Sequence, residues 1–280
     1  MRIQFIVPLI VVNILFFASC KKQKFSQAEI TATTDIALVQ GLSTDLQTLA
    51  EQAHTLDSSY MYASSACVKI KLDTSHTTST QDLLIIDFGT SPCQCRDNKY
   101  RTGKLIITYS NGFTSTLSNL TISFDNYGVG LSSVALSKLT NSSTQTIINN
   151  RFNTNGFLSW SISSNLTINT SLGKTITFKD NLKRVQTTGN PLIFDGDNRF
   201  TITGSGSGTT SNDINFNCSV FTGKDLLKDF SCAKTFTQGI ITVSSSALTA
   251  DILIDFGDSS CTNNKATIQK SRSKQEITLE

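Results

Sequence analysis

Two aspartates are the first candidates for chemistry, because each closes an apolar run with the same tripeptide, Asp-Phe-Gly. Asp87 and Asp255 occupy equivalent places in two similar segments of the sequence. Two carboxylates about 5–10 Å apart in one cleft could hydrolyse a glycosidic bond. Their equivalence favours another interpretation, in which each carboxylate supports the same strand-to-turn structure in its own segment. A carboxylate-based hydrolase is therefore a minor alternative.

Nucleophilic hydrolysis finds little support in the other residues. The chain has two histidines, His54 and His76, and no Gly-x-Ser-x-Gly elbow that would present a serine to either of them. Histidine is the commonest general base, and neither residue has an evident partner. We therefore expect a protein that is not an enzyme, with no catalytic residues and no cofactor.

Trp160 and Tyr127 are the candidates for binding a sugar, since exposed aromatic rings offer amphipathic platforms. The chain holds 17 Phe, 5 Tyr and one Trp, a bias that favours core filling. Trp160 lies in the alternating run 157–162, which is typical of a strand. Core packing is the favoured interpretation. A glycan-binding module is the alternative, and it requires Trp160 or Tyr127 to be exposed.

An internal repeat organises the chain. Residues 82–93 and 251–261 both run from an apolar strand through Asp-Phe-Gly and a turn to a cysteine. Each segment is preceded by a Cys-x-Lys sequence, which begins at Cys67 in the first copy and at Cys232 in the second. The repeat therefore predicts equivalent disulfides in the two copies.

The number of cysteines also supports disulfide formation, since the chain has seven. When Cys20 is set aside, six remain, an even number that fits an oxidising compartment. Zinc is not indicated, since no histidine lies near a cysteine, and we predict no metal site. Cys95 lies in an insertion of the first copy and either pairs with Cys218 or stays free. The predicted pairs are Cys67–Cys93 and Cys232–Cys261.

The elements that position these residues are one helix followed by strands. Apolar residues three and four apart predict an amphipathic helix over 34–58, which we expect to pack on a sheet. From residue 66 to 280 the sequence turns to β-branched and aromatic runs separated by turn signals. The Gly-Ser run 204–208 reads as a flexible loop. The helical stripe consists of Val39, Leu42, Leu46, Leu49, Ala53 and Leu56.

The predicted fold class is mainly β: an antiparallel sandwich, half-barrel or barrel with an internal repeat, preceded by the helix. Two related halves, about 66–150 and 151–280, could divide the β domain.

The N-terminus predicts a lipoprotein. Residues 1–19 combine Arg2, an apolar run and small residues before Cys20, the layout of a cleaved signal peptide whose cysteine becomes the acylated (palmitate-carrying) first residue. Residues 20–33 are then expected to form a polar tether. Without Arg2 the mature chain has 23 basic and 21 acidic residues, a formal charge of +2 that does not indicate a nucleic-acid partner. Membrane lipid, through acylated Cys20, is the expected partner.

Several segments resemble a group of uncharacterised, β-rich envelope lipoproteins of the Bacteroidota. They are the Asp-Phe-Gly-x3-Cys segment from Asp87 to Tyr109, the runs 121–127 and 202–206, and the Ser-Cys-Lys-Lys sequence 19–22. The resemblance implies an envelope location and no known activity. Lysines rather than acidic residues follow Cys20, which favours an outer-membrane anchor facing the periplasm over surface display. The expected function is a non-catalytic structural or binding role, with a glycan or an envelope protein as a possible partner.

Overall fold

The computed structural model describes residues 24–54, 67–73, 81–110, 117–152, 156–189, 197–232, 234–259, 261 and 264–279. The predicted signal peptide and Cys20 lie outside these ranges, as do His76 and Leu56. Within the described ranges, no helix combines the length and the apolar character needed to cross a membrane.

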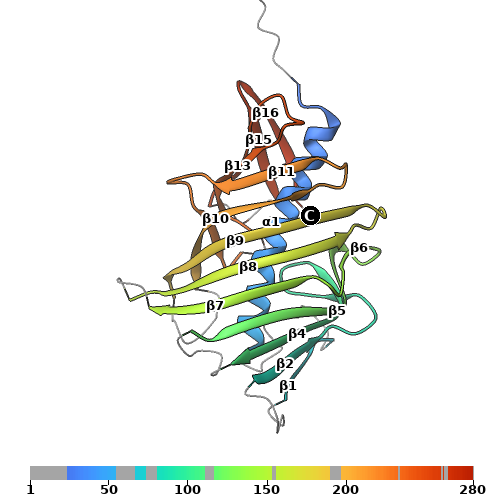
Figure 1. Cartoon of the computed structure of the whole chain (residues 1–280), viewed down its shortest axis with the longest axis vertical. Coiled ribbons are helices and arrows are strands. Elements are labelled where there is room, and N and C mark those ends of the chain that lie inside the picture. Colours follow the sequence, from blue (N-terminus) through green and yellow to red (C-terminus); the bar gives the residue numbers. More distant parts are fainter. Residues whose placement is uncertain are drawn as a thin grey trace, which may run out of the picture.

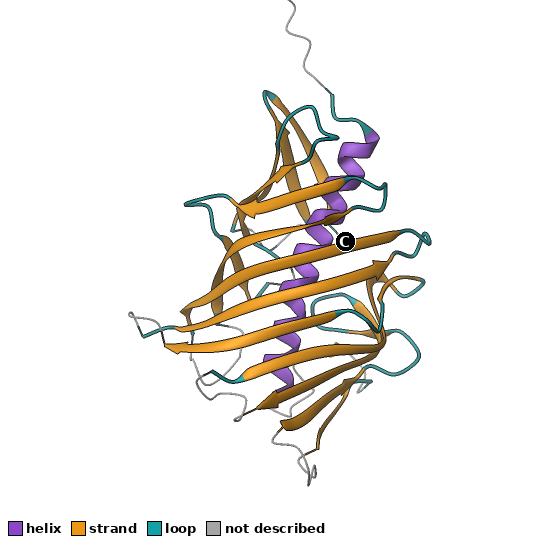
Figure 2. Ribbon diagram, in the orientation of Figure 1, coloured by secondary structure: helices purple, strands orange, loops and turns teal. Residues whose placement is uncertain are grey.

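One antiparallel sheet of sixteen strands forms most of the molecule (Figures 1 and 2). The prediction of a mainly antiparallel β protein is confirmed, with one continuous sheet in place of the two stacked sheets of a sandwich. The main path is β1-β2-β4-β5-β6-β8-β9-β10-β11-β13-β14-β15-β16, with β3 beside β4, β7 between β5 and β8, and β12 beside β10 and β13. The strands are β1 (Lys69–Asp73), β2 (Gln81–Asp87), β3 (Cys93–Gln94), β4 (Tyr100–Ser110), β5 (Asn119–Ser132), β6 (Ala135–Leu139), β7 (Thr144–Phe152), β8 (Leu158–Asn169), β9 (Thr175–Thr188), β10 (Arg199–Thr209), β11 (Asn215–Val220), β12 (Leu226–Asp229), β13 (Gln238–Ser244), β14 (Ile252–Asp258), β15 (Lys265–Lys270) and β16 (Ser273–Thr278).

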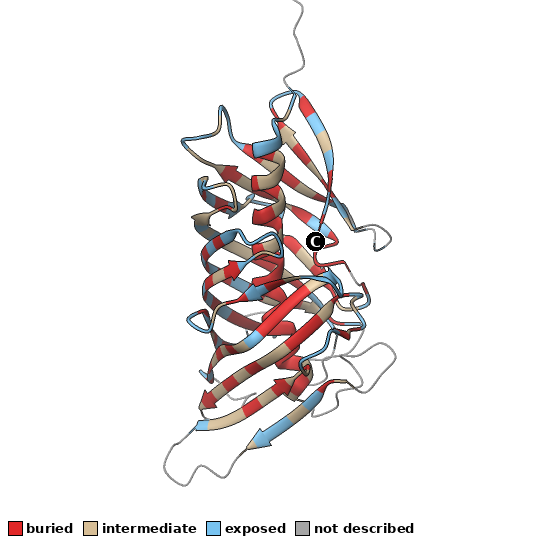
Figure 3. Ribbon diagram, turned by 90° about the vertical axis from the view of Figure 1, so that its right-hand side faces the viewer, coloured by how far each residue is buried: buried red, intermediate tan, exposed pale blue. Residues whose placement is uncertain are grey.

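The helix α1 (Gln27–His54) runs across the strands on the inner face of this curved sheet (Figure 1). It contacts β2 as well as β14 and β16, so it connects strands that are far apart in the sheet order. Burial covers almost its whole circumference, polar positions included (Figure 3). The predicted packing of the helix on the sheet is confirmed by the described part of its stripe, which is buried: Val39, Leu42, Leu46, Leu49 and Ala53.

The helix begins seven residues before the predicted start at residue 34, so residues 27–33 are not part of an extended tether. Ser26 and Glu29 explain the difference, because they form a reciprocal capping box. The Glu29 amide donates to the Ser26 hydroxyl at 3.2 Å, and the Ser26 amide donates to the Glu29 carboxylate at 2.8 Å. The Ser-x-x-Glu spacing is a helix-start signal in the sequence that lies before the apolar stripe.

The two repeat copies occupy the two ends of the same sheet. The first copy supplies β1, β2, β4 and β5, and the second supplies β13 to β16 in the same antiparallel order. Both predicted disulfides, Cys67–Cys93 and Cys232–Cys261, are present. The repeat therefore corresponds to one structural unit, a disulfide-closed meander, used twice.

The segment 204–208 was predicted as a flexible loop, and this prediction is wrong. It forms the second half of β10, between β9 and β11. The glycines have a packing reason: Phe178 and Phe216 both lie opposite Gly208, and their rings stack at 6.2 Å. A Cβ at Gly208 would lie 1.9 Å from the Thr177 carbonyl oxygen. Aromatic rings on the flanking strands thus replace the side chains that the glycines lack.

Candidate functional site

Asp87 and Asp255 serve separate turns, as the repeat suggested. The Asp87 carboxylate accepts the Gly89 amide at 2.8 Å, and the Asp255 carboxylate accepts the Gly257 amide at 2.9 Å. Both glycines have positive φ, which glycine adopts without strain. Since each carboxylate closes its own turn on a different repeat copy, the two do not form a catalytic pair. The hydrolase alternative thereby loses its named candidates.

Trp160 and Tyr127 do not form an exposed platform, so the glycan-binding alternative lacks the exposed ring that it requires. Trp160 is 4% exposed and packs edge-on against Phe200 at 5.8 Å. Tyr127 is completely buried, and its hydroxyl accepts a hydrogen bond from Nε of Arg101 at 3.2 Å. Burial raises the pKa of Tyr127. Both rings belong to the core, in agreement with the favoured interpretation of the aromatic pool.

Among the cysteines that the structure describes, the two outside the bridges are free thiols. Cys95 and Cys218 are both buried, and they are not paired with each other. Burial raises the pKa of Cys95, and it raises the pKa of Cys218 to about 12. A buried thiol with a raised pKa is a poor nucleophile at neutral pH, so neither suggests chemistry.

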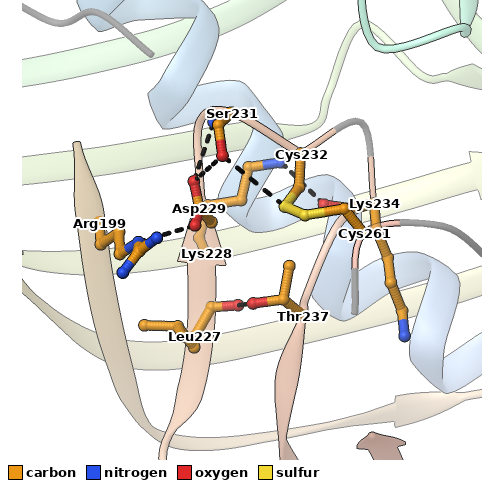
Figure 4. The surroundings of a disulfide bond; sticks show 9 residues. All are labelled: Arg199, Leu227, Lys228, Asp229, Ser231, Cys232, Lys234, Thr237 and Cys261. Atoms are coloured by element: carbon orange, nitrogen blue, oxygen red, sulfur yellow. Dashed lines mark hydrogen bonds and ion pairs between the residues drawn. A yellow bond between two sulfur atoms is a disulfide. The ribbon is translucent and has the colours of Figure 1, made fainter. Parts of the chain in front are cut away.

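The second bridge lies within a hydrogen-bonded network (Figure 4). Ser231, next to Cys232, donates from its hydroxyl to Asp229 at 2.6 Å. The other carboxylate oxygen of Asp229 pairs with Nε of Arg199 at 2.7 Å. These contacts connect the residues around the bridge to one another, so we assign them a role in stabilising the fold.

The least expected feature is a group of charges buried between α1 and the sheet. Asp45 on α1 forms an ion pair with Lys99, and it lies 3.9 Å from both Arg101 and Lys228. Arg101 also binds Asp97 through two hydrogen bonds, of 2.8 and 2.5 Å. We call these five residues the Asp45 cluster. It holds three cations and two carboxylates, so it carries one excess positive charge.

Opposite charges in the Asp45 cluster stabilise one another in their ionised forms. Burial opposes ionisation of Asp97, but the adjacent guanidinium of Arg101, together with Lys99 and Lys228, lowers the pKa of Asp97 overall. Burial lowers the pKa of Lys228, and the Asp45 carboxylate opposes that shift. Mutual compensation of this kind is required when charges are removed from water.

A second buried ion pair lies near the C-terminal end of α1, six residues after Asp45. Glu51 lies 2.8 Å from Nη2 of Arg184, and the Arg184 guanidinium lies 3.7 Å from the centre of the Phe200 ring. Trp160 and Phe230 approach the same guanidinium at 5.6 Å. Burial raises the pKa of Glu51 and lowers that of Arg184, and the mutual attraction of the two charges opposes both shifts. The aromatic rings also attract the guanidinium.

A cavity of about 280 Å³ opens between α1 and the β5–β6 hairpin, beside the Asp45 cluster. We call it the α1–β6 cavity. Lys99 is the one ionisable residue among those that line it, and its ammonium also donates to Thr235 at 3.3 Å. The described lining residues are Leu38, Gly41, Leu42, Lys99, Val129, Gly130, Leu131, Ser132, Ala135, Ser137, Ser171 and Thr235.

Two glycines in the cavity lining, Gly41 and Gly130, lie where a side chain would clash with neighbouring atoms. A Cβ at Gly41 would lie 2.8 Å from Cγ2 of Thr235, and a Cβ at Gly130 would lie 2.4 Å from the Ala135 carbonyl oxygen. The glycines therefore allow the helix, the hairpin and the segment before β13 to approach closely around the cavity.

Two exposed apolar turn tips adjoin the cavity. The β5–β6 turn carries Val134, which is 92% exposed, and the β8–β9 turn carries Leu172, which is 87% exposed. Each residue is close in sequence to a lining residue, Ser132 and Ser171 respectively. Both turns lie at the same edge of the sheet, on the right of Figure 1. Two turns close to lining residues therefore carry exposed apolar side chains, a feature common at binding sites for apolar partners.

The sequence contains one weak signal for this site. Asp45, Gln47 and Glu51 interrupt the helical stripe at positions that a solvated face would also contain. Their burial depends on a sheet that curves around the helix, and only the three-dimensional structure shows that.

No protein-family model, no curated protein and no solved structure matches this chain significantly. Within the described ranges, no three His, Cys, Asp or Glu side chains gather as metal ligands would.

Proposed function

We propose that this chain is a lipid-anchored, non-catalytic protein of the bacterial envelope that holds a small, largely apolar ligand in the α1–β6 cavity. The observation that carries the proposal is the cavity itself, which combines apolar walls with a few polar groups, the composition typical of ligand sites. Its single ionisable lining residue, Lys99, is already engaged by Asp45 and has no nucleophile–base partnership, which favours binding over catalysis.

The proposed location is supported by two independent features. Residues 1–20 have the layout of a lipoprotein signal. Two disulfides close the two repeat copies, and disulfides persist in oxidising compartments such as the periplasm. Residues 24–26 lead directly into α1, so the proposed anchor would be a short segment away from the folded part.

Anchoring is tested by metabolic labelling with a fatty acid in a bacterial host. We expect label on the wild-type chain and none on Cys20→Ser, because the acyl group requires the cysteine at the mature N-terminus. Cys218→Ser is a control for loss of a cysteine and should keep the label. Equal labelling of wild type and Cys20→Ser would contradict the proposed anchor.

Ligand binding is tested with N-phenyl-1-naphthylamine, a neutral dye whose fluorescence rises when it leaves water. Ser137 is buried and lines the cavity, whereas Leu136 beside it on β6 does not line it. We expect Ser137→Phe to fill the cavity and to raise the dye Kd at least tenfold, while Leu136→Phe leaves it unchanged. Thermal unfolding verifies that both variants are folded. Equal dye binding by the two variants would exclude the α1–β6 cavity as the site.

A further inference from the structure

We propose that the ligand of the α1–β6 cavity is a single-chain fatty acid whose carboxylate binds Lys99. The inference rests on the proposed function, since it names the chemical class that the same cavity accepts. Three observations carry it: the excess charge of the Asp45 cluster, the remaining donor of Lys99, and the volume of the cavity with the exposed apolar residues on two nearby turns.

The charge beside the cavity favours an anion. Lys99, Arg101 and Lys228 face the two carboxylates Asp45 and Asp97, and all of them are buried except Asp97, which is partly exposed. In a region of low dielectric constant, one uncompensated positive charge attracts an anion far more strongly than it would in water. A monoanionic headgroup at Lys99 would bring the group to neutrality.

Lys99 has a donor available for that headgroup. A lysine ammonium has three N–H donors. Among the described residues, Lys99 donates one to Asp45 and one to Thr235, which leaves the third. Asp45 would keep its compensation if Lys99 also contacted a ligand, because Arg101 and Lys228 lie 3.9 Å from it on other sides. A carboxylate can accept a charge-assisted hydrogen bond from the ammonium, and such bonds are stronger than neutral ones.

The remainder of the lining suits one alkyl chain. Leu38, Leu42 and Val129 supply apolar surface beside Lys99. The volume of about 280 Å³ lies at the lower limit of typical ligand pockets, so it fits a slender molecule and not a two-chain phospholipid. A chain longer than the cavity would emerge between the two turns that carry Val134 and Leu172, whose exposed side chains would cover its end.

The test compares ligands that share a ten-carbon chain and differ in the headgroup. Decanoate, 1-decanol and decyltrimethylammonium each compete with N-phenyl-1-naphthylamine on the folded wild-type chain. We expect decanoate to displace the dye at a concentration at least tenfold lower than 1-decanol, and the cationic amphiphile to be the weakest. Lys99→Met should abolish the preference for decanoate over 1-decanol while the dye still binds. Lys138→Met is the control, because Lys138 lies on β6 of the cavity-lining β5–β6 hairpin but outside the lining, and it should keep the preference.

The outcomes separate the two proposals. Equal displacement by decanoate and 1-decanol, with dye binding still blocked by Ser137→Phe, overturns the fatty acid while the cavity remains a binding site. Dye binding that Ser137→Phe leaves intact overturns both. The wild-type comparison alone decides the headgroup if Lys99→Met fails to fold, because it requires no variant.

Discussion

Replacing Asp45 by leucine is expected to lower the free energy of unfolding by about 3–5 kcal/mol, the usual consequence of removing one member of a buried charge network. Asp45 is the carboxylate that faces Lys99, Arg101 and Lys228 together. Its loss would leave Lys99 and Lys228 buried without a carboxylate partner among these contacts. Urea unfolding at pH 7 measures the effect.

The pH dependence of the Asp45→Leu variant should identify the cause. A buried lysine without a counterion has a pKa below that of the unfolded chain, so between those two values the unfolded state binds more protons. Stability of the variant relative to wild type should therefore rise as pH rises from 7 toward 10. Asp125→Leu is the matched control, because Asp125 is half exposed and pairs with Lys104 at 3.9 Å. That surface pair should contribute only about 0–1 kcal/mol. Similar losses for Asp45→Leu and Asp125→Leu would contradict the importance of the Asp45 cluster.

The second large effect is expected at the Glu51–Arg184 pair. Either Glu51→Leu or Arg184→Leu should destabilise the fold by about 3–5 kcal/mol, because each leaves the other charge buried and alone. The double variant should lose much less than the sum of the two, since Trp160, Phe200 and Phe230 already provide an apolar surrounding. A double-mutant cycle by urea unfolding measures the coupling, and additive losses would show that the two side chains are not energetically paired.

Acid should partly rescue Arg184→Leu. Burial already raises the pKa of Glu51 in the wild type, and loss of the guanidinium removes the largest force that opposes this shift. Between the unfolded and the folded pKa of Glu51, the folded state binds more protons than the unfolded state. The variant should therefore recover stability relative to wild type as pH falls toward 4.5. Lys183→Leu, an exposed neighbour on β9, should show neither the loss nor the recovery.

Local patterns in the sequence predicted most of the elements and the two disulfides, although they missed the start of α1 and the second half of β10. The spacing of Val39, Leu42 and Leu46 predicted the helix, and the repeated Asp-Phe-Gly…Cys order predicted which cysteines pair. These features depend on neighbours in the chain or on a comparison of two copies. They do not require knowledge of how distant segments meet.

The site could not be predicted in the same way, because it depends on curvature. Asp45 and Glu51 have the spacing of a solvated helix face, and they become interior groups only because strands from both repeat copies surround α1. Gly206 and Gly208 suggested a loop for a related reason, since the rings that stabilise them belong to the neighbouring strands β9 and β11. Lys99 gains its importance from Asp45 and Thr235, which lie 54 and 136 residues away.

The position of α1 also has a consequence for biosynthesis. The helix is made first, yet Glu29 finds Lys270 across 241 residues and Asp35 accepts the Ser211 amide across 176. Such contacts give a high contact order, which slows folding. The helix α1 can make these contacts only after the strands near residue 270 have been synthesised. The β15–β16 hairpin, which carries Lys270, then completes the enclosure of the helix.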